Sequence, residues 1–263
     1  MNILEIKNMH TWFHMDSGVV KSVDGVDIEL KEGSTLGIVG ESGSGKSVTA
    51  LSVMGLLMGT TGKIEKGEIL LDGRDIVHIG NEERRKLRGS KISMIFQEPM
   101  TSLNPVMKIG DQIMEAILMH QKVSKKEAEE KAIEMLRMTG LPRVEKMMKE
   151  YPFQLSGGQR QVLALLMATM TPIDFLILDE HTAALDPRTA EIVMKLTDQI
   201  VREKKMTTVM VTHNLRYALE YGDRILMMHQ GKIVLDKVGE EKNQLNTDEI
   251  MGIFNRISVE CGN

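Results

Sequence analysis

The chain has 263 residues, of which 42% are hydrophobic and 27% are charged, so it is long enough to bury the core of one sizeable α/β domain. Its 33 basic and 37 acidic side chains give a formal net charge of −4. That balance provides no overall basic field, and we therefore expect no nucleic-acid partner, with a local basic patch left open as the alternative.

The cysteine content and the apolar stretches indicate the cellular compartment and the relation of the protein to a membrane. Cys261 is the single cysteine, so no internal disulfide can form and we expect a reducing compartment. The most apolar stretch, residues 162–178, is interrupted by Pro172 and Asp174 and is too short for a comfortable bilayer span. The opening MNILEIKNMH lacks the uninterrupted apolar core of a signal peptide. We expect a cytoplasmic protein that, at a membrane, works as a peripheral subunit.

The N-terminal third of the chain shows the patterns of β-strands. Apolar and polar residues alternate at 4–6 and at 26–30, as they do in half-buried strands. Residues 35–39 (TLGIV) are almost wholly apolar, which is typical of a buried parallel strand. Further strands are predicted at 67–73 and 91–97.

Helical spacing replaces this alternation from residue 109 to residue 141. Ser124 and Glu127 have the spacing of a capping box, and apolar residues follow on one face. Gly140 and Pro142 predict the end of the helix. Because this helical stretch lies between strand-rich portions, we interpret it as an inserted helical subdomain.

Strands and helices alternate again in the C-terminal third. A strand is predicted at 175–178, and Asp186 followed by proline predicts a helix start. The apolar run at 207–212 predicts another strand. A hairpin is expected around 229–232, and a short helix from about Asn246.

Residues 40–47, here called the phosphate loop, read GESGSGKS and match the pattern G-x-x-x-x-G-K-[ST] at every defined position. Glycines let the backbone curl around phosphate oxygens, and the following helix adds its positive dipole end. The positively charged ammonium of Lys46 would contact the β- and γ-phosphates, and the Ser47 hydroxyl would bind Mg²⁺. A glycine-rich turn that binds nothing is the alternative, but the strand before the loop and the amphipathic segment 48–57 after it favour nucleotide binding. The predicted binding residues are Gly40, Glu41, Ser42, Gly43, Ser44, Gly45, Lys46 and Ser47.

Two carboxylates follow the apolar strand FLIL. Asp179 suits a water-mediated contact with Mg²⁺, and Glu180 suits a general base that polarises the attacking water. Paired carboxylates also occur at ordinary strand ends. Behind a phosphate loop, however, they indicate a nucleotide-hydrolysing site.

Residues 155–159, here called the signature segment, read LSGGQ and open the helical run QRQVLALLMA. The N–H groups of Ser156, Gly157 and Gly158, with the serine hydroxyl, are expected to form an anion site at the start of that helix.

The phosphate loop and the signature segment together resemble the ATP-binding cassette (ABC) ATPases. The resemblance implies one α/β domain over residues 1–263: a P-loop NTPase core with an N-terminal antiparallel β subdomain and a helical subdomain at approximately 99–165. In this family the signature segment, Gln159 included, faces the γ-phosphate held by a second subunit, so two ATP molecules join a head-to-tail dimer. ATP binding closes that dimer and hydrolysis opens it.

Other residues typical of this family also have counterparts in this chain, and they occur in the same order along the sequence. Gln97 resembles the glutamine that contacts Mg²⁺ and water, and Asp186 resembles the aspartate that communicates across the dimer. His213 resembles the switch histidine at the γ-phosphate. Phe13, with Trp12 as the alternative, resembles the aromatic that stacks on adenine, although an N-terminal aromatic more often serves simple packing.

Different parts of the chain resemble different branches of this family. Residues 10–152 resemble the oligopeptide and dipeptide importer branch. The segments 179–200 and 211–236 resemble another importer-type branch with amino-acid-like substrates, and His181 stands where most relatives carry proline.

The implied function is that of the energy-coupling ATPase of an importer of peptides or amino-acid-like solutes, using ATP and Mg²⁺ at the cytoplasmic face of the cell membrane. Implied partners are transmembrane permease subunits, a second identical or different ATPase subunit, and indirectly an extracytoplasmic solute-binding protein. One alternative is a non-transport ABC protein of DNA repair or ribosomes, but the long insertions of that class are missing from this sequence. The other is a regulatory nucleotide-binding module without turnover, against which Glu180 and His213 argue.

Overall fold

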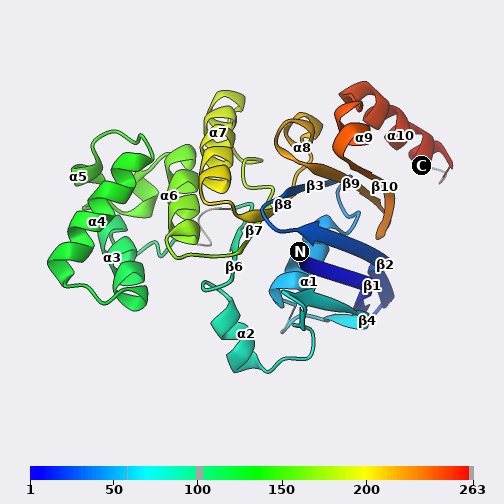
Figure 1. The fold of residues 1–263 in the computed structure, drawn as a ribbon, viewed down its shortest axis with the longest axis horizontal. Helices are drawn as coiled ribbons and strands as arrows, with labels where there is room; N and C mark the ends of the chain where they lie inside the picture. Colours follow the sequence, from blue (N-terminus) through cyan, green and yellow to red (C-terminus); the bar gives the residue numbers. More distant parts are fainter. Residues whose placement is uncertain (58, 99–102, 261–263) are drawn as a thin grey trace. The chain divides into compact units, whose positions relative to one another are not determined.

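The computed structural model describes residues 1–57, 59–98 and 103–260, so Cys261 lies outside the described part (Figure 1). The chain divides into two compact units. The first unit joins Met1–Arg85 to Lys205–Asn263, and the second is Lys86–Lys204. Helix α2 (Asn81–Leu87) contains the point at which the chain passes from the first unit to the second.

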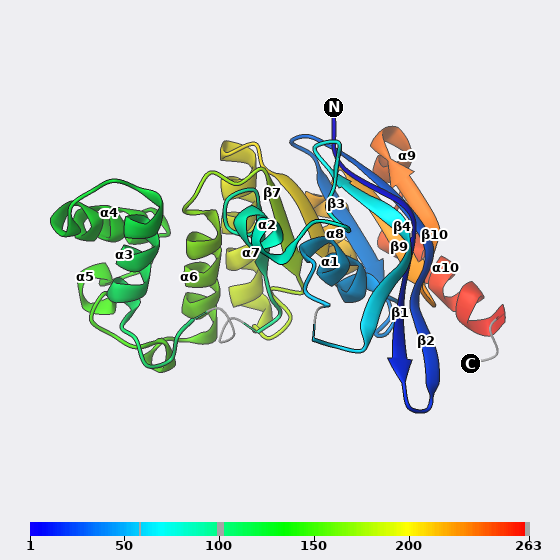
Figure 2. The same cartoon turned by 90° about the horizontal axis from the view of Figure 1, so that it is seen from below.

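An antiparallel sheet forms from the N-terminal part of the first unit. Its strands are ordered β2 (Gly18–Lys31), β1 (Asn2–Met15), β4 (Gly62–Leu71) and β5 (Arg74–Asp75). Leu4 and Ile6 of β1 are buried, as the predicted alternation requires. Figure 2 shows the β1–β2 hairpin extending beyond the other strands of this unit.

A second group of strands in this unit carries the phosphate loop. These strands are ordered β10 (Lys232–Val238), β9 (Arg224–His229), β3 (Thr35–Gly40) and β8 (Thr207–Val211). Strand β3 pairs in parallel with both β8 and β9, and nearly all of its side chains are buried, which accounts for its unbroken apolar run. The phosphate loop therefore leaves the carboxyl end of a parallel strand.

Helices cover these strands. Helix α1 (Lys46–Met54) packs against strands of both sheets, and α8 (Leu215–Tyr221) packs on β3. A Cβ at Gly37 of β3 would lie 3.0 Å from the Cβ of Ala218, so the glycine allows this close packing. The C-terminal helices are α9 (Gly239–Asn243) and α10 (Thr247–Glu260), and Ile250 of α10 joins the core under α8.

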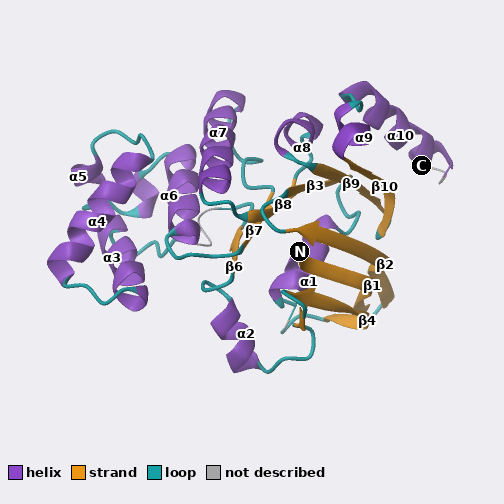
Figure 3. Cartoon of the chain, in the orientation of Figure 1, coloured by secondary structure: helices purple, strands orange, loops and turns teal. Residues whose placement is uncertain are grey.

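The second unit combines a parallel strand pair with a helical cluster. Strands β6 (Ile92–Ile95) and β7 (Phe175–Asp179) pair in parallel. Figure 3 shows the helices of this unit, which are α3 (Ile109–His120), α4 (Lys125–Met138), α5 (Val144–Met147), α6 (Gly157–Thr169) and α7 (Pro187–Glu203), with a short 3₁₀ turn at Pro152–Gln154. Ile109, Ile113 and Ile117 at helical spacing face the buried Ala128, Ala132 and Leu136 of α4.

Most predicted elements are confirmed, with shifted ends. The capping box is present: Ser124 Oγ accepts from the Glu127 N–H at 3.3 Å, and the Ser124 N–H donates to Glu127 Oε2 at 2.7 Å. The helical stretch at 109–141 is two helices, because the chain turns between α3 and α4. Helix α1 ends at Met54 rather than near 57, since Gly55 takes a left-handed C-cap. Within the described residues, no helix combines the length and apolar character needed to cross a bilayer.

Candidate nucleotide site

The phosphate loop wraps around the start of α1 in the first unit. Gly43 and Gly45 have φ of 79° and 103°, a region that residues with a Cβ rarely adopt. Lys46 is buried, and its ammonium donates to the carbonyl oxygens of Gly40 and Glu41, each at 2.8 Å. The lysine is therefore held over the loop by the loop's own backbone.

Strand β2 and the end of β9 with the turn after it lie directly against this loop in the first unit. A Cβ at Gly45 would lie 2.3 Å from the carbonyl oxygen of Ser22 on β2, and one at Gly40 would lie 2.4 Å from that of Met228 on β9. The Gly231 N–H in the β9–β10 turn donates to the Ser44 carbonyl at 3.0 Å. Gly40 and Gly45 are thus required by packing as well as by their backbone conformation.

Polar atoms at the loop fit a phosphate ligand. Ser44 Oγ is buried and has no hydrogen-bond partner among the described residues, a pattern that a bound oxyanion would resolve. Ser47, one residue into α1, is half-buried. The donors of the loop and of the start of α1 are therefore suited to phosphate oxygens.

A buried histidine beside the loop was not anticipated from the sequence. His229 ends β9, its Nδ1 lies 4.0 Å from Glu41 Oε2, and its buried Nε2 finds no partner within the described part of the chain. The sequence predicts only that His229 lies in a hairpin. It does not predict that this histidine lies beside the phosphate loop, because the parallel pairing of β9 with β3 brings it there.

The second unit brings two predicted catalytic residues together. Because β6 and β7 are parallel, their carboxyl ends meet, and Gln97 Nε2 lies 3.5 Å from Glu180 Oε2. Asp179 is buried, whereas Glu180 is half-buried. Glu180 has φ of 49°, a left-handed conformation that costs a non-glycine residue about 1–2 kcal/mol. Strain of this kind is concentrated at functional sites.

His181, next to Glu180, is a core residue. Its Nε2 lies 3.2 Å from Thr197 Oγ1, and that hydroxyl donates to the Val193 carbonyl. The hydroxyl oxygen therefore accepts a hydrogen bond from the imidazole N–H. Burial lowers the pKa of His181 to about 4, so the ring is neutral at pH 7.

The signature segment begins α6 with a capping box. Ser156 Oγ accepts from the Gln159 N–H at 3.3 Å, and Gln159 Oε1 accepts from the Ser156 N–H at 2.9 Å. Ser156 is exposed, Gly157 is half-buried and Gly158 is buried. The Gln159 side chain is thus engaged within its own helix.

Three further predicted residues lie on three different elements or beside them. Asp186 caps α7 by accepting from the Thr189 N–H at 3.1 Å, and this hydrogen bonding lowers the pKa of Asp186. His213 is exposed just beyond β8. Phe13 is half-buried on β1, where a Cβ at Gly62 would lie 2.7 Å from its ring.

The neighbouring aromatic, Trp12, has different surroundings. Lys21 Nζ lies 4.6 Å from the centre of the Trp12 ring, and the indole Nε1 is buried without a partner among the described residues. A cation already lies over this ring. Phe13 therefore remains the better candidate for stacking on a base.

A strand, a glycine-rich loop and a helix that begins with a buried lysine define a P-loop nucleotide-hydrolysing protein. A family model described as ABC transporter matches residues 23–183. The oligopeptide transport ATP-binding protein AppD of Bacillus subtilis (strain 168) is 43% identical over 88% of this chain and 71% of its own length. The dipeptide transport ATP-binding protein DppD of Lactococcus lactis subsp. cremoris (strain MG1363) is 41% identical over 88% of this chain and 66% of its own.

Solved structures of a bacterial ABC transporter cassette are also similar to this chain. The dimeric structure of MJ0796, a bacterial ABC transporter cassette, has a TM-score of 0.77 at 30% identity, covering 89% of this chain and 98% of that one. A post-hydrolysis dimer of the same cassette bound to ADP and Pi has a TM-score of 0.77 at 29% identity, covering the same shares. The chain belongs to the ABC transporter family and is an ATPase.

Proposed function

We propose that this ATPase energises the import of peptides by working with transmembrane permease subunits at the cytoplasmic face of the membrane. The phosphate loop with its buried, pre-positioned Lys46 is the observation that carries the ATP-dependent part. The relatives named for oligopeptide and dipeptide transport support the substrate class. An extracytoplasmic solute-binding protein is an indirect partner in this proposal.

Within this proposal the loop residues and Phe13 hold ATP, and Ser47, Gln97 and Asp179 hold Mg²⁺. Mg²⁺ keeps several waters and needs few protein ligands beside phosphate oxygens. Glu180 polarises the attacking water, Gln97 orients Glu180, and His213 contacts the γ-phosphate.

We further infer that two ATPase subunits share each ATP. The signature segment begins α6, where the backbone N–H groups of Ser156, Gly157 and Gly158 attract an anion, and Ser156 is exposed. These groups would act on the nucleotide of the second subunit, with Asp186 communicating between the sites. The dimeric form of the similar cassette supports this arrangement.

We propose that residues 1–263 form one ABC ATPase domain with a helical subdomain at approximately 99–165. The buried cluster shared by α3, α4, α5 and α6 supports such a subdomain. Residues 99–102 of this range lie outside the described part of the chain.

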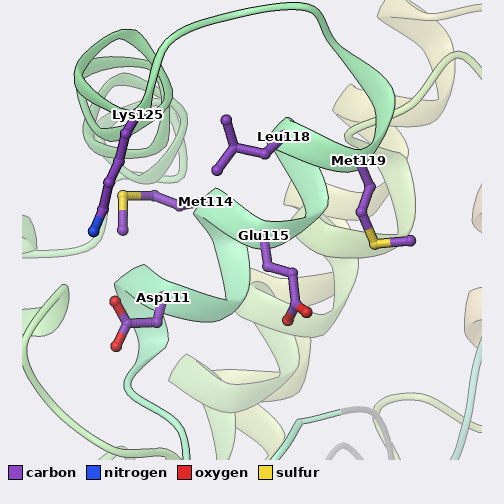
Figure 4. A pocket seen from close by; sticks show the side chains of 6 residues that line it. All are labelled: Asp111, Met114, Glu115, Leu118, Met119 and Lys125. Atoms are coloured by element: carbon purple, nitrogen blue, oxygen red, sulfur yellow. The ribbon is translucent and has the colours of Figure 1, made fainter.

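A hollow on the helical subdomain suits a permease helix. It has a volume of about 360 Å³ and is lined by Asp111, Met114, Glu115, Leu118, Met119 and Lys125 (Figure 4). Met119 is 74% exposed and Leu118 41% exposed, whereas Ile109 of the same helix belongs to the core. Exposed methionines provide an adaptable apolar surface. The acidic Asp111 and Glu115 would suit a segment with basic residues.

Co-expression with permeases tests this partner. The chain should be captured from detergent with a peptide-class permease and not with an amino-acid-class permease. Leu118→Glu together with Met119→Glu should lower capture about tenfold or more, because two charges replace the apolar contact. Met138→Glu, at another exposed methionine (76% exposed), is the matched control. Capture by the amino-acid class alone, or undiminished capture of the double variant, would contradict the proposal.

A further inference from the structure

We infer that a buried hydrogen bond between His181 and Thr197 positions Glu180, the residue proposed to polarise the attacking water. Both side chains are buried inside the second unit, so we assign them a positioning role and no contact with ATP. This role rests on the proposed function of Glu180 as the general base, and it adds two positioning residues to the same site.

The turn after β7 holds Glu180 in an unfavourable backbone conformation. The last paired residues of β6 and β7 are Ile95 and Leu178, and Glu180 then takes a φ of 49°. The Glu180 carbonyl accepts a hydrogen bond from the Ala183 N–H at 2.9 Å, which closes a tight turn. A left-handed conformation of a residue with a Cβ persists only where the surrounding structure holds it. The turn must therefore be held by contacts beyond the end of the strand pair.

His181 makes such a contact with the middle of α7. Its Nε2 lies 3.2 Å from Thr197 Oγ1, and the Thr197 hydroxyl donates its own hydrogen to the Val193 carbonyl at 2.8 Å. The hydroxyl oxygen can therefore only accept from the ring, which fixes both the tautomer of His181 and the direction of the hydrogen bond. A buried N–H without an acceptor is unfavourable, so this hydrogen bond keeps the turn against α7.

Glu180 is thus held from both sides while its own side chain stays accessible. Asp179 before it and His181 after it are buried, whereas Glu180 is half-buried. Its Oε2 lies 3.5 Å from Gln97 Nε2. A catalytic group must be kept within about 0.5 Å of its productive position by neighbours whose own side chains are fixed. The hydrogen bond from His181 to a helix provides such a fixed neighbour on the side that the strand pair does not hold.

Thr197→Val in the full chain tests this role, because valine keeps the shape of threonine and removes the acceptor. The kcat for ATP hydrolysis should fall about tenfold, since a small displacement of a catalytic group slows the reaction. The KM for ATP should stay within about twofold of the wild-type value, because the phosphate loop is unchanged. Thr197→Ser keeps the hydroxyl and should keep kcat within about twofold of wild type. Steady-state phosphate release measures both constants.

Thr169→Val is the matched control. Thr169 is also buried in the second unit, and its hydroxyl donates to the Leu165 carbonyl at 2.9 Å, four residues earlier in α6. The control therefore removes the same kind of buried hydroxyl from another helix. Both valine variants should lower the melting temperature by roughly 2–4 °C or less, but Thr169→Val should hydrolyse ATP at the wild-type rate.

The double variant Glu180→Gln/Thr197→Val distinguishes positioning of Glu180 from a general loss of structure. If Thr197 acts through Glu180, the double variant should hydrolyse ATP at the rate of Glu180→Gln alone, because the base that Thr197 positions is already missing. A further loss of about tenfold in the double variant would show a merely structural role and overturn the inference.

A second pair of variants covers the case in which Thr197→Val does not fold. His181→Leu removes the ring N–H, whereas His181→Gln offers an amide N–H at a similar distance from the backbone. The kcat of His181→Leu should be about tenfold below that of His181→Gln. Equal kcat values for these two variants would overturn the inference.

Three further results would overturn the positioning role. They are a wild-type kcat in Thr197→Val, equal losses of kcat in Thr197→Val and Thr197→Ser, and equal losses in Thr197→Val and Thr169→Val. The proposed base has its own test in Glu180→Gln. Near-normal hydrolysis by that single variant would contradict the proposed base and, with it, the positioning role. An inactive Glu180→Gln beside a fully active Thr197→Val would contradict the positioning role alone.

Discussion

Replacing Glu180 with glutamine should abolish nearly all ATP hydrolysis and leave ATP binding intact. The substitution keeps the size of the side chain and the 3.5 Å approach to Gln97 but removes the negative charge that would polarise water. A positioned general base contributes about 10²- to 10⁴-fold to the rate, and a loss of that size is expected. Steady-state phosphate release measures the rate, and nucleotide titration measures binding.

Glu180→Gln should also trap an ATP-bound dimer, visible as an earlier peak in size-exclusion chromatography with ATP. Glu145→Gln is the matched control, because Glu145 is an exposed carboxylate in a surface ion pair with Arg137. It should hydrolyse ATP at the wild-type rate. Near-normal hydrolysis by Glu180→Gln would exclude Glu180 as the base.

Replacing Lys46 with alanine should instead weaken ATP binding. The buried ammonium donates hydrogen bonds to the carbonyl oxygens of Gly40 and Glu41, and its positive charge would attract the phosphates of ATP. Hydrogen bonds to charged groups are worth about 1.5–3 kcal/mol, so affinity should fall roughly 10- to 100-fold.

The control for this loss is Lys195→Ala, at an exposed lysine on α7. Isothermal titration with ATP should give the wild-type affinity for the control and a weaker affinity for Lys46→Ala. Equal affinities for the two variants would show that the loop does not use Lys46 to hold the phosphates.

Local signals allowed much of the fold to be predicted. The capping box at Ser124, the cap at Asp186 and the glycine-rich loop all act within a few residues, so their spacing identifies them directly. Helix α2 cannot be predicted from an apolar period, because only its last residue, Leu87, is apolar and none of its residues is buried. Helix α8 was missed although Asn214 caps it, because its seven residues are too few to show a clear period.

Features that depend on distant segments could not be predicted. The approach of Ser22 to Gly45 joins residues from β2 and the phosphate loop. The buried His181 has its hydrogen-bond partner, Thr197, on α7, and the position of His229 depends on strand order. The site was predicted as a list of residues, whereas the contacts that hold those residues required the structure.

Mixing two inactive variants tests the shared site, which is the central claim. Lys46→Ala should bind ATP weakly in its own loop, and Ser156→Arg should be unable to act on a partner's nucleotide. A mixed dimer leaves one composite site intact, formed by the loop of the Ser156→Arg chain and the signature segment of the Lys46→Ala chain. The mixture should recover part of the hydrolysis that each variant lacks alone. No recovery, in samples where mixed dimers are demonstrated by differently tagged copies, would contradict the head-to-tail arrangement.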